Sequence, residues 1–89
     1  MEKRIGSALI LVEDGSEVSH LNEILSRHAQ IIISRQGIPL REKKISLISL
    51  VLEGTTDEIG ALTGQAGRLK SIRIKSLLIP LKEQKNEKD

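Results

Sequence analysis

The chain has 89 residues, a formal net charge of +2, no Cys and no aromatic residue. This length is enough for one domain and not two, and so small a charge does not argue for a nucleic-acid partner. The absence of Cys excludes disulfides, thiolate metal sites and a cysteine nucleophile. The absence of aromatic residues leaves a core of Ile, Leu, Val and Ala, and it excludes the aromatic platforms on which RNA-binding domains stack bases.

Residues 4–12 form a short apolar run that predicts the first strand. Because Glu13 and Asp14 follow it directly and no small-residue cleavage site appears, we expect a strand and not a signal peptide. No apolar run approaches the roughly 20 residues of a membrane span. We therefore expect a cytoplasmic protein without a membrane partner.

Apolar residues at helical spacing predict a helix within residues 13–29. Either Asp14 or Ser16 can cap its N-terminus, and Glu17 stands where the capping-box partner of Asp14 would be. A run of β-branched residues then opens residues 31–36, which predicts the second strand. Gly37 and Pro39 predict the connection that leaves this strand.

The second half of the chain predicts the same order of elements. Residues 44–54 favour a long strand, residues 55–70 repeat the helical pattern, and residues 71–80 favour a final strand. Thr55 and Glu58 have the spacing of a capping box at the start of the second helix.

The two halves align without a gap over the helices and the strands that follow them. A repeated β-α-β unit of this size is typical of an α+β, ferredoxin-like βαββαβ sandwich, a four-stranded antiparallel sheet with two helices on one face. We expect the first and third strands in the middle of the sheet, one domain over residues 1–81, and a charged disordered tail over residues 82–89. The aligned positions are Val18, Leu21, Leu25, His28, Ile31 and Ile33 on Ile59, Leu62, Ala66, Leu69, Ile72 and Ile74.

The predicted central strands are apolar on both faces, although two helices can cover only one face of a sheet. A contiguous exposed apolar patch normally marks an interface, so we expect a homodimer or a higher homo-oligomer. Glycines inside the second predicted helix lack an obvious local role, and they suggest close helix packing or a tight contact with a subunit or ligand. The expected interface residues are Leu9, Leu11, Leu47, Val51, Gly60 and Gly64.

No residue pattern indicates a catalytic or metal centre. His20 and His28 are the two histidines; His20 with Glu17 or Glu23 could form a weak surface metal site, but a structural role is favoured for both. The carboxylates cluster at predicted helix starts, where the helix dipole explains them. We therefore expect no catalytic residues, no metal, no cofactor and no enzymatic activity.

Two motifs resemble those of a known family. Arg35-Gln36-Gly37-Ile38-Pro39 and Ile59-Gly60-Ala61-Leu62-Thr63-Gly64, followed by Gly67 and Lys75, are similar to segments of the proposed regulators of the iron-only hydrogenase system. The resemblance covers Arg4 to Leu78. It implies a ferredoxin-fold, ACT-like regulatory domain, similar to the ligand-binding half of nickel-responsive repressors, with no DNA-binding segment of its own.

ACT-like domains bind small effectors where the loop after the first strand meets a neighbouring subunit, and the resemblance places such a site here. A helix N-terminus offers free N–H groups to an anionic effector, although an ordinary capped turn explains the same residues. Two alternatives stay open: a structural assembly module without a ligand, and a weak hydrolase or isomerase. The expected ligand-binding residues are Asp14, Gly15, Ser16, Gly37, Ile38 and Pro39.

Overall fold

A computed structural model describes residues 2–81 and confirms the ferredoxin-like α+β fold. The expected tail over residues 82–89 lies outside the described residues. The strands are β1 (Arg4–Val12), β2 (Ile32–Leu40), β3 (Ile45–Gly54) and β4 (Ile72–Pro80), and the helices are α1 (Val18–Arg27) and α2 (Thr56–Gly67).

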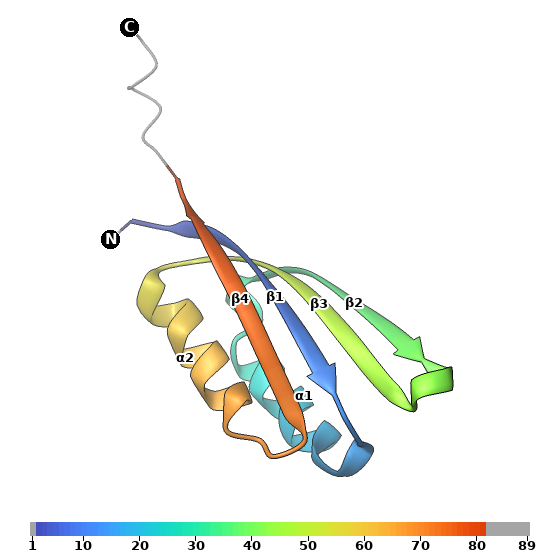
Figure 1. Cartoon of the computed structure of the whole chain (residues 1–89). Helices are drawn as coiled ribbons and strands as arrows, with labels where there is room; N and C mark the ends of the chain where they lie inside the picture. The colour runs from blue at the N-terminus through green and yellow to red at the C-terminus, as the bar shows by residue number, and fades with distance from the viewer. Residues whose placement is uncertain (1, 82–89) are drawn as a thin grey trace, which may run out of the picture.

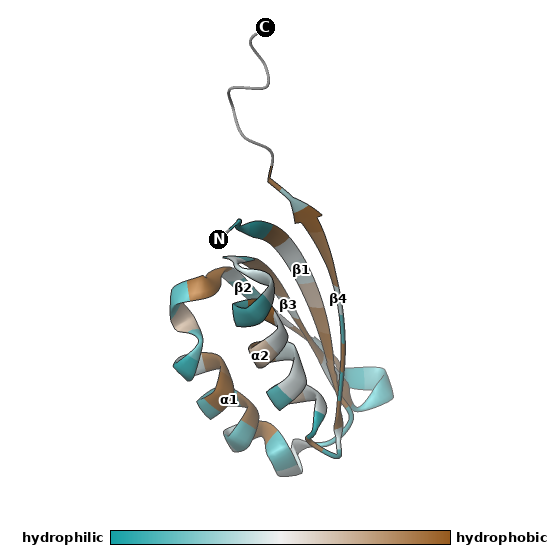
Figure 2. Cartoon of the chain, turned by 90° about the vertical axis from the view of Figure 1, so that its left-hand side faces the viewer, coloured by the Kyte–Doolittle hydropathy of each residue, from teal (hydrophilic) through white to brown (hydrophobic). Residues whose placement is uncertain are grey.

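The sheet has the strand order β2-β3-β1-β4, so the predicted central positions of β1 and β3 are confirmed. Every neighbouring pair is antiparallel. Figure 1 shows α1 and α2 side by side on one face of the sheet. Figure 2, rotated by 90° from the view of Figure 1, shows that no described element covers the other face.

The hydrophobic core lies between the two helices and the sheet. Both helices place an apolar stripe on the sheet, as the predicted periodicity requires. Alternate side chains of the central strands point into the same layer, because successive residues of a strand face opposite sides. The buried aliphatic residues are Ala8, Ile10, Val12, Leu21, Ile24, Leu25, Ile31, Leu50, Leu52, Ile59, Leu62, Ala66 and Ile72.

The start of α1 differs from the prediction, whereas the start of α2 confirms it. A 3₁₀ turn, Gly15–Glu17, precedes α1, and Asp14 caps this turn by accepting a hydrogen bond from the backbone N–H of Ser16. Glu17 makes no capping box; its carboxylate contacts His20 instead. At α2 the Thr55 and Glu58 side chains each accept the other's backbone N–H, which completes the predicted box.

The second strand is longer than predicted, because Gly37 and Pro39 lie inside β2 and not in the connection that follows it. Pro39 is tolerated there since an edge strand leaves one row of N–H groups without a sheet partner. The turn itself is a 3₁₀ helix, Arg41–Lys43, followed by Lys44 in the left-handed region at φ 58°.

A β-bulge also breaks the equivalence expected between Ile33 and Ile74. The register of β2 on β3 shifts between Ile32 and Ser34, which leaves Ile33 as the extra residue. The Ile33 side chain is exposed and is not part of the core. Ile74, in contrast, packs against the core. The internal repeat therefore fails at this position because a bulge reverses the face of a strand residue.

Candidate functional site

The face of the sheet opposite the helices carries aliphatic side chains from all four strands. The pairing registers place side chains from all four strands beside one another there. Leu47 of β3, for example, lies between Leu11 of β1 and Ile38 of β2. We call this surface the open sheet face, and its apolar residues are Ile5, Leu9, Leu11, Ile38, Leu47, Val51, Leu77 and Ile79.

Several of these side chains are strongly exposed. Leu77 is 66% exposed, Leu9 is 50% exposed and Val51 is 37% exposed. Leu11 and Leu47 are half-buried by their neighbours. An exposed apolar set that spans four strands is more than scattered surface aliphatics and is typical of an interaction site.

Polar residues interrupt the open sheet face in a regular way. Ser7 lies between Leu77 and Val51, and Ser49 lies between Leu9 and Gln36. Small hydroxyl side chains therefore alternate with large aliphatic ones across the strands. This alternation gives the surface a relief of shallow hollows between raised side chains.

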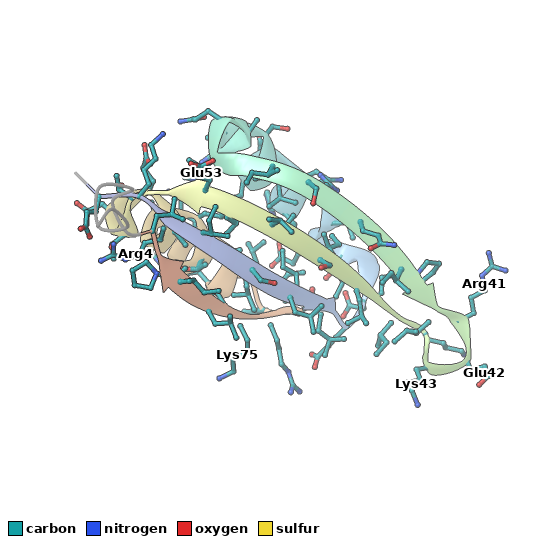
Figure 3. The ribbon with its side chains drawn as sticks, turned by 90° about the horizontal axis from the view of Figure 1, so that it is seen from above. Arg4, Arg41, Glu42, Lys43, Glu53 and Lys75 are labelled. Carbon is teal, nitrogen blue, oxygen red and sulfur yellow. The ribbon has the colours of Figure 1, made fainter. Side chains whose placement is uncertain are left out.

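Charged residues lie around the open sheet face. Figure 3 looks onto this face and places Arg4 and Glu53 near one end and Lys75 at the β4 edge. Arg41 and Lys43 stand at the tip of the β2–β3 hairpin, at the opposite end. An apolar centre with a charged rim is the usual anatomy of a protein interface.

The structure brings four of the six expected interface residues together and separates the other two. Leu9, Leu11, Leu47 and Val51 all belong to the open sheet face, but Gly60 and Gly64 are exposed on α2, on the opposite side of the domain. A Cβ atom added at either glycine would meet nothing within 4 Å. Close helix packing inside the chain is therefore not the reason for these glycines, and their interface role stays a prediction. The expected interface residues did not include Ile5, Leu77 and Ile79, and Ile38 was expected to bind a ligand instead. The alternation of apolar and polar residues in the strands was the available signal.

The turn at residues 14–16 is a compact capped turn. The Asp14 carboxylate accepts the Ser16 N–H at 2.8 Å. Hydrogen bonds from Ser16, the hydroxyl first and the backbone N–H second, hold the pKa of Asp14 below its ordinary value. The ionised Asp14 carboxylate thus already accepts the Ser16 N–H group that an anionic ligand would need.

Gly37, Ile38 and Pro39 lie near this turn but do not join it in one pocket. The pairs Val12–Ser46 and Pro39–Ser46 put β3 between the two segments, at the same end of the sheet. Ile38 points onto the open sheet face. Pro39 lines a hollow of about 220 Å³ at the hairpin, together with residues 40–43. The expected ligand residues thus share one end of the sheet without forming a closed site within a single chain.

A groove of about 480 Å³ runs between α1 and α2 on the helical side. Arg27, at the end of α1, and Arg68, which follows α2 directly, both line it. Gln65 also lines the groove, and its Oε1 lies 3.2 Å from Nε2 of His28. His20 lines the groove as well, and its Nδ1 lies 2.8 Å from Oε1 of Glu17. Both histidines therefore have a side-chain partner within the chain, and their structural role stays a prediction.

The His20–Glu17 contact predicts a measurable pH dependence. The hydrogen bond that the Glu17 carboxylate accepts from the His20 ring raises the pKa of His20 above 6.5, and the same bond lowers the pKa of Glu17 below 4.5. The small stabilisation from His20 is thus present below pH 6.5 and lost as the pH rises through its folded pKa; that from Glu17 is lost as the pH falls through its own. In an NMR titration, Glu17→Gln is expected to lower the pKa of His20. An unchanged His20 titration would contradict this.

Two findings concern residues 2–81 as a whole. Within them, no three or more His, Cys, Asp or Glu side chains are grouped so that they could hold a metal ion. None of the helices in this described part of the chain has the length and apolarity needed to cross a membrane. The expectation of no metal and no cofactor stays a prediction.

The strand order and the two helices place this chain in the class of small ferredoxin-like domains. The family described as "TM1266-like: Iron-only hydrogenase system regulator, putative" matches residues 4–76. The chain belongs to this family, which confirms the resemblance carried by the two motifs. No curated protein matches the chain.

Solved structures agree with this assignment. The uncharacterized protein TM1266 from Thermotoga maritima is 39% identical, with a TM-score of 0.80 over 91% of this chain and 100% of that chain. CPII from Thiomonas intermedia K12, solved with ADP, AMP and acetate, is 12% identical, with a TM-score of 0.54 over 93% of this chain and 94% of its own. The divalent ion tolerance protein CutA1 from Ehrlichia chaffeensis is 14% identical, with a TM-score of 0.52 over 94% and 89% of the two chains. The last two similarities support the fold alone.

Proposed function

We propose that this protein is a non-enzymatic regulatory domain of the iron-only hydrogenase system that works as a homo-oligomer and binds a small effector. The observation that carries the proposal is the open sheet face, an exposed aliphatic surface that no described part of the chain covers. Each aliphatic side chain removed from water contributes about 1.5–3 kcal/mol. A small domain without aromatic residues gains much of its stability by covering such a face.

The size of the open sheet face suits a second copy. Four strands about 4.8 Å apart, followed for about eight residues of 3.3 Å each, give a footprint of roughly 500 Å². Two such faces stacked together cover about 1,000 Å² in total, which is about the minimum expected of a biological interface. Two antiparallel sheets that pack face to face interdigitate their side chains in this way.

The effector half of the proposal concerns the end of the sheet where residues 14–16 and 37–39 lie. In one chain this end is open, so a neighbouring subunit would have to complete a pocket. Since Asp14 occupies the turn, an anionic group would be held by the basic hairpin, where Arg41, Lys43 and Lys44 are exposed. The solved complex of the distant CPII with ADP, AMP and acetate is compatible with effector binding on this fold.

Gly37→Val is the variant that tests the effector half. A Cβ atom at Gly37 meets nothing within 4 Å, and the residue lies in a strand, where Val is favoured. We therefore expect an unchanged or slightly higher unfolding midpoint. A thermal-shift screen with metal ions, amino acids and nucleotides should find a compound that stabilises the natural protein and stabilises Gly37→Val less.

Gly6→Val provides the contrast for this experiment. A Cβ atom at Gly6 would lie 2.7 Å from Cδ2 of Leu78 and 3.3 Å from the Leu77 carbonyl oxygen, so this variant should lose folding stability. If no compound in the screen stabilises the natural protein, the assembly module without a ligand is favoured instead. A Gly37→Val variant that loses folding and ligand response equally would also contradict the effector half.

A further inference from the structure

A hollow of about 180 Å³ lies on the open sheet face between β1 and β4. The registers explain it, because Ser7 pairs with Leu77 and Leu9 pairs with Lys75. The short Ser7 side chain thus lies between two large ones, Leu9 and Leu77. The hollow is lined by Ser7, Leu9, Lys75, Ser76 and Leu77.

The hollow has the size and the chemistry to hold one aliphatic side chain. Its volume is several times the roughly 30 Å³ that a water molecule takes in the liquid. Two Leu side chains form opposite walls, and the charged Lys75 stands at the β4 edge of the sheet, on the rim of the surface. Apolar walls of this kind gain most from an apolar occupant.

We propose that this hollow is a socket for an aliphatic side chain of a second copy, and that the side chain is Leu77. This inference rests on the proposed self-association through the open sheet face. Leu77 is 66% exposed, the highest value among the large apolar residues described. In a two-fold contact the same patch meets itself, and an axis passing beside Ser7 would bring each copy's Leu77 over the other's hollow.

The socket makes Ser7 a residue that determines how two copies fit. Close-packed interfaces reject extra side-chain volume, since overpacking forces neighbours out of their preferred rotamers. A larger residue at position 7 would fill the hollow from inside and push the partner's Leu77 away. The same residue would add apolar area to the face, and apolar area alone strengthens association. Overpacking would weaken self-association, whereas added apolar area would strengthen it. One variant at position 7 therefore shows which effect dominates.

The test compares Ser7→Leu with Ser34→Leu by sedimentation equilibrium. Both serines are exposed, and each pairs with Val51 of β3 from one side. Ser34 lies on β2, however, and does not line the hollow. We expect Ser7→Leu to weaken self-association at least about tenfold, an effect of ordinary overpacking. Ser34→Leu should leave association unchanged or strengthen it. Equal or tighter association of Ser7→Leu would overturn the socket.

Leu77→Ala is the second variant, and it keeps the test decisive if Ser7→Leu fails to fold. It removes the proposed inserting side chain from an exposed position, so the monomer fold should survive while association weakens at least about tenfold. Circular dichroism verifies the fold of each variant. A natural protein that is monomeric at every concentration would refute the self-association itself. A natural dimer that keeps its affinity with Leu77→Ala would refute only the socket.

Discussion

Val51→Glu is expected to convert the self-associated protein into a folded monomer. Val51 lies on the central strand β3, on the open sheet face, and is 37% exposed in the single chain. In the isolated monomer a Glu there reaches water, so the fold should persist. In a stacked pair it would bury an unpaired charge, which costs several kcal/mol. We expect the dissociation constant to rise at least about a hundredfold, measured by sedimentation equilibrium.

Val18→Glu is the matched control for this prediction. Val18 has the same residue type and nearly the same exposure, 38%, but it lies at the start of α1 on the helical side. A Glu in the first turn of a helix is favourable because of the helix dipole. Association should therefore be unchanged. Equal dissociation of both variants would show that net charge acts, and not the open sheet face.

Leu50→Ala is expected to give the largest loss of folding stability. Leu50 precedes Val51 on β3 but faces the helices and is 0% exposed. Truncating a buried Leu to Ala removes apolar contacts and leaves a cavity, at a cost of about 2–5 kcal/mol. This is a large part of the roughly 5–15 kcal/mol of a typical domain. Urea unfolding at one fixed protein concentration measures the change, since the proposed self-association would add to apparent stability.

Val18→Ala serves as the reference for this second prediction. Its side chain is partly exposed on α1, so its removal should change the free energy of unfolding by less than about 0.5 kcal/mol. A similar loss for both variants would mean that the layer between helices and sheet is not the core. A loss below about 1 kcal/mol for Leu50→Ala would have the same meaning.

The order of elements could be predicted from the sequence because local patterns specify it. Aliphatic runs mark β1 and β3, and the Thr55–Glu58 spacing marks the start of α2 in the sequence and in the structure. The apolar second face of the central strands was also visible, since it depends only on consecutive aliphatic residues. The strand order follows from the repeat of the β-α-β unit.

The errors arose where tertiary contacts override a local signal. Gly37 and Pro39 indicate a turn by themselves, but the edge position of β2 lets the strand continue through them. The bulge at Ile33 depends on the register with β3, which a single sequence does not specify. The capped turn at Asp14 likewise delays the start of α1 by a few residues.

Part of the candidate site could likewise be predicted from the sequence, and part of it depends on tertiary contacts. Leu9, Leu11, Leu47 and Val51 could be grouped from the sequence because adjacent central strands carry them. The hollow at Ser7 could not, because it depends on which β4 residue stands opposite each β1 residue. The shape of the open sheet face therefore depends on the pairing registers of the strands and not on composition.

Sedimentation equilibrium of the natural protein, from micromolar to millimolar concentration, tests the central claim most directly. One chain has a mass of 9.8 kDa. If a second copy covers the open sheet face, the measured mass will be at least twice this value at the higher concentrations. A mass of one chain throughout the range would show that this aliphatic surface stays in water, and it would contradict the account.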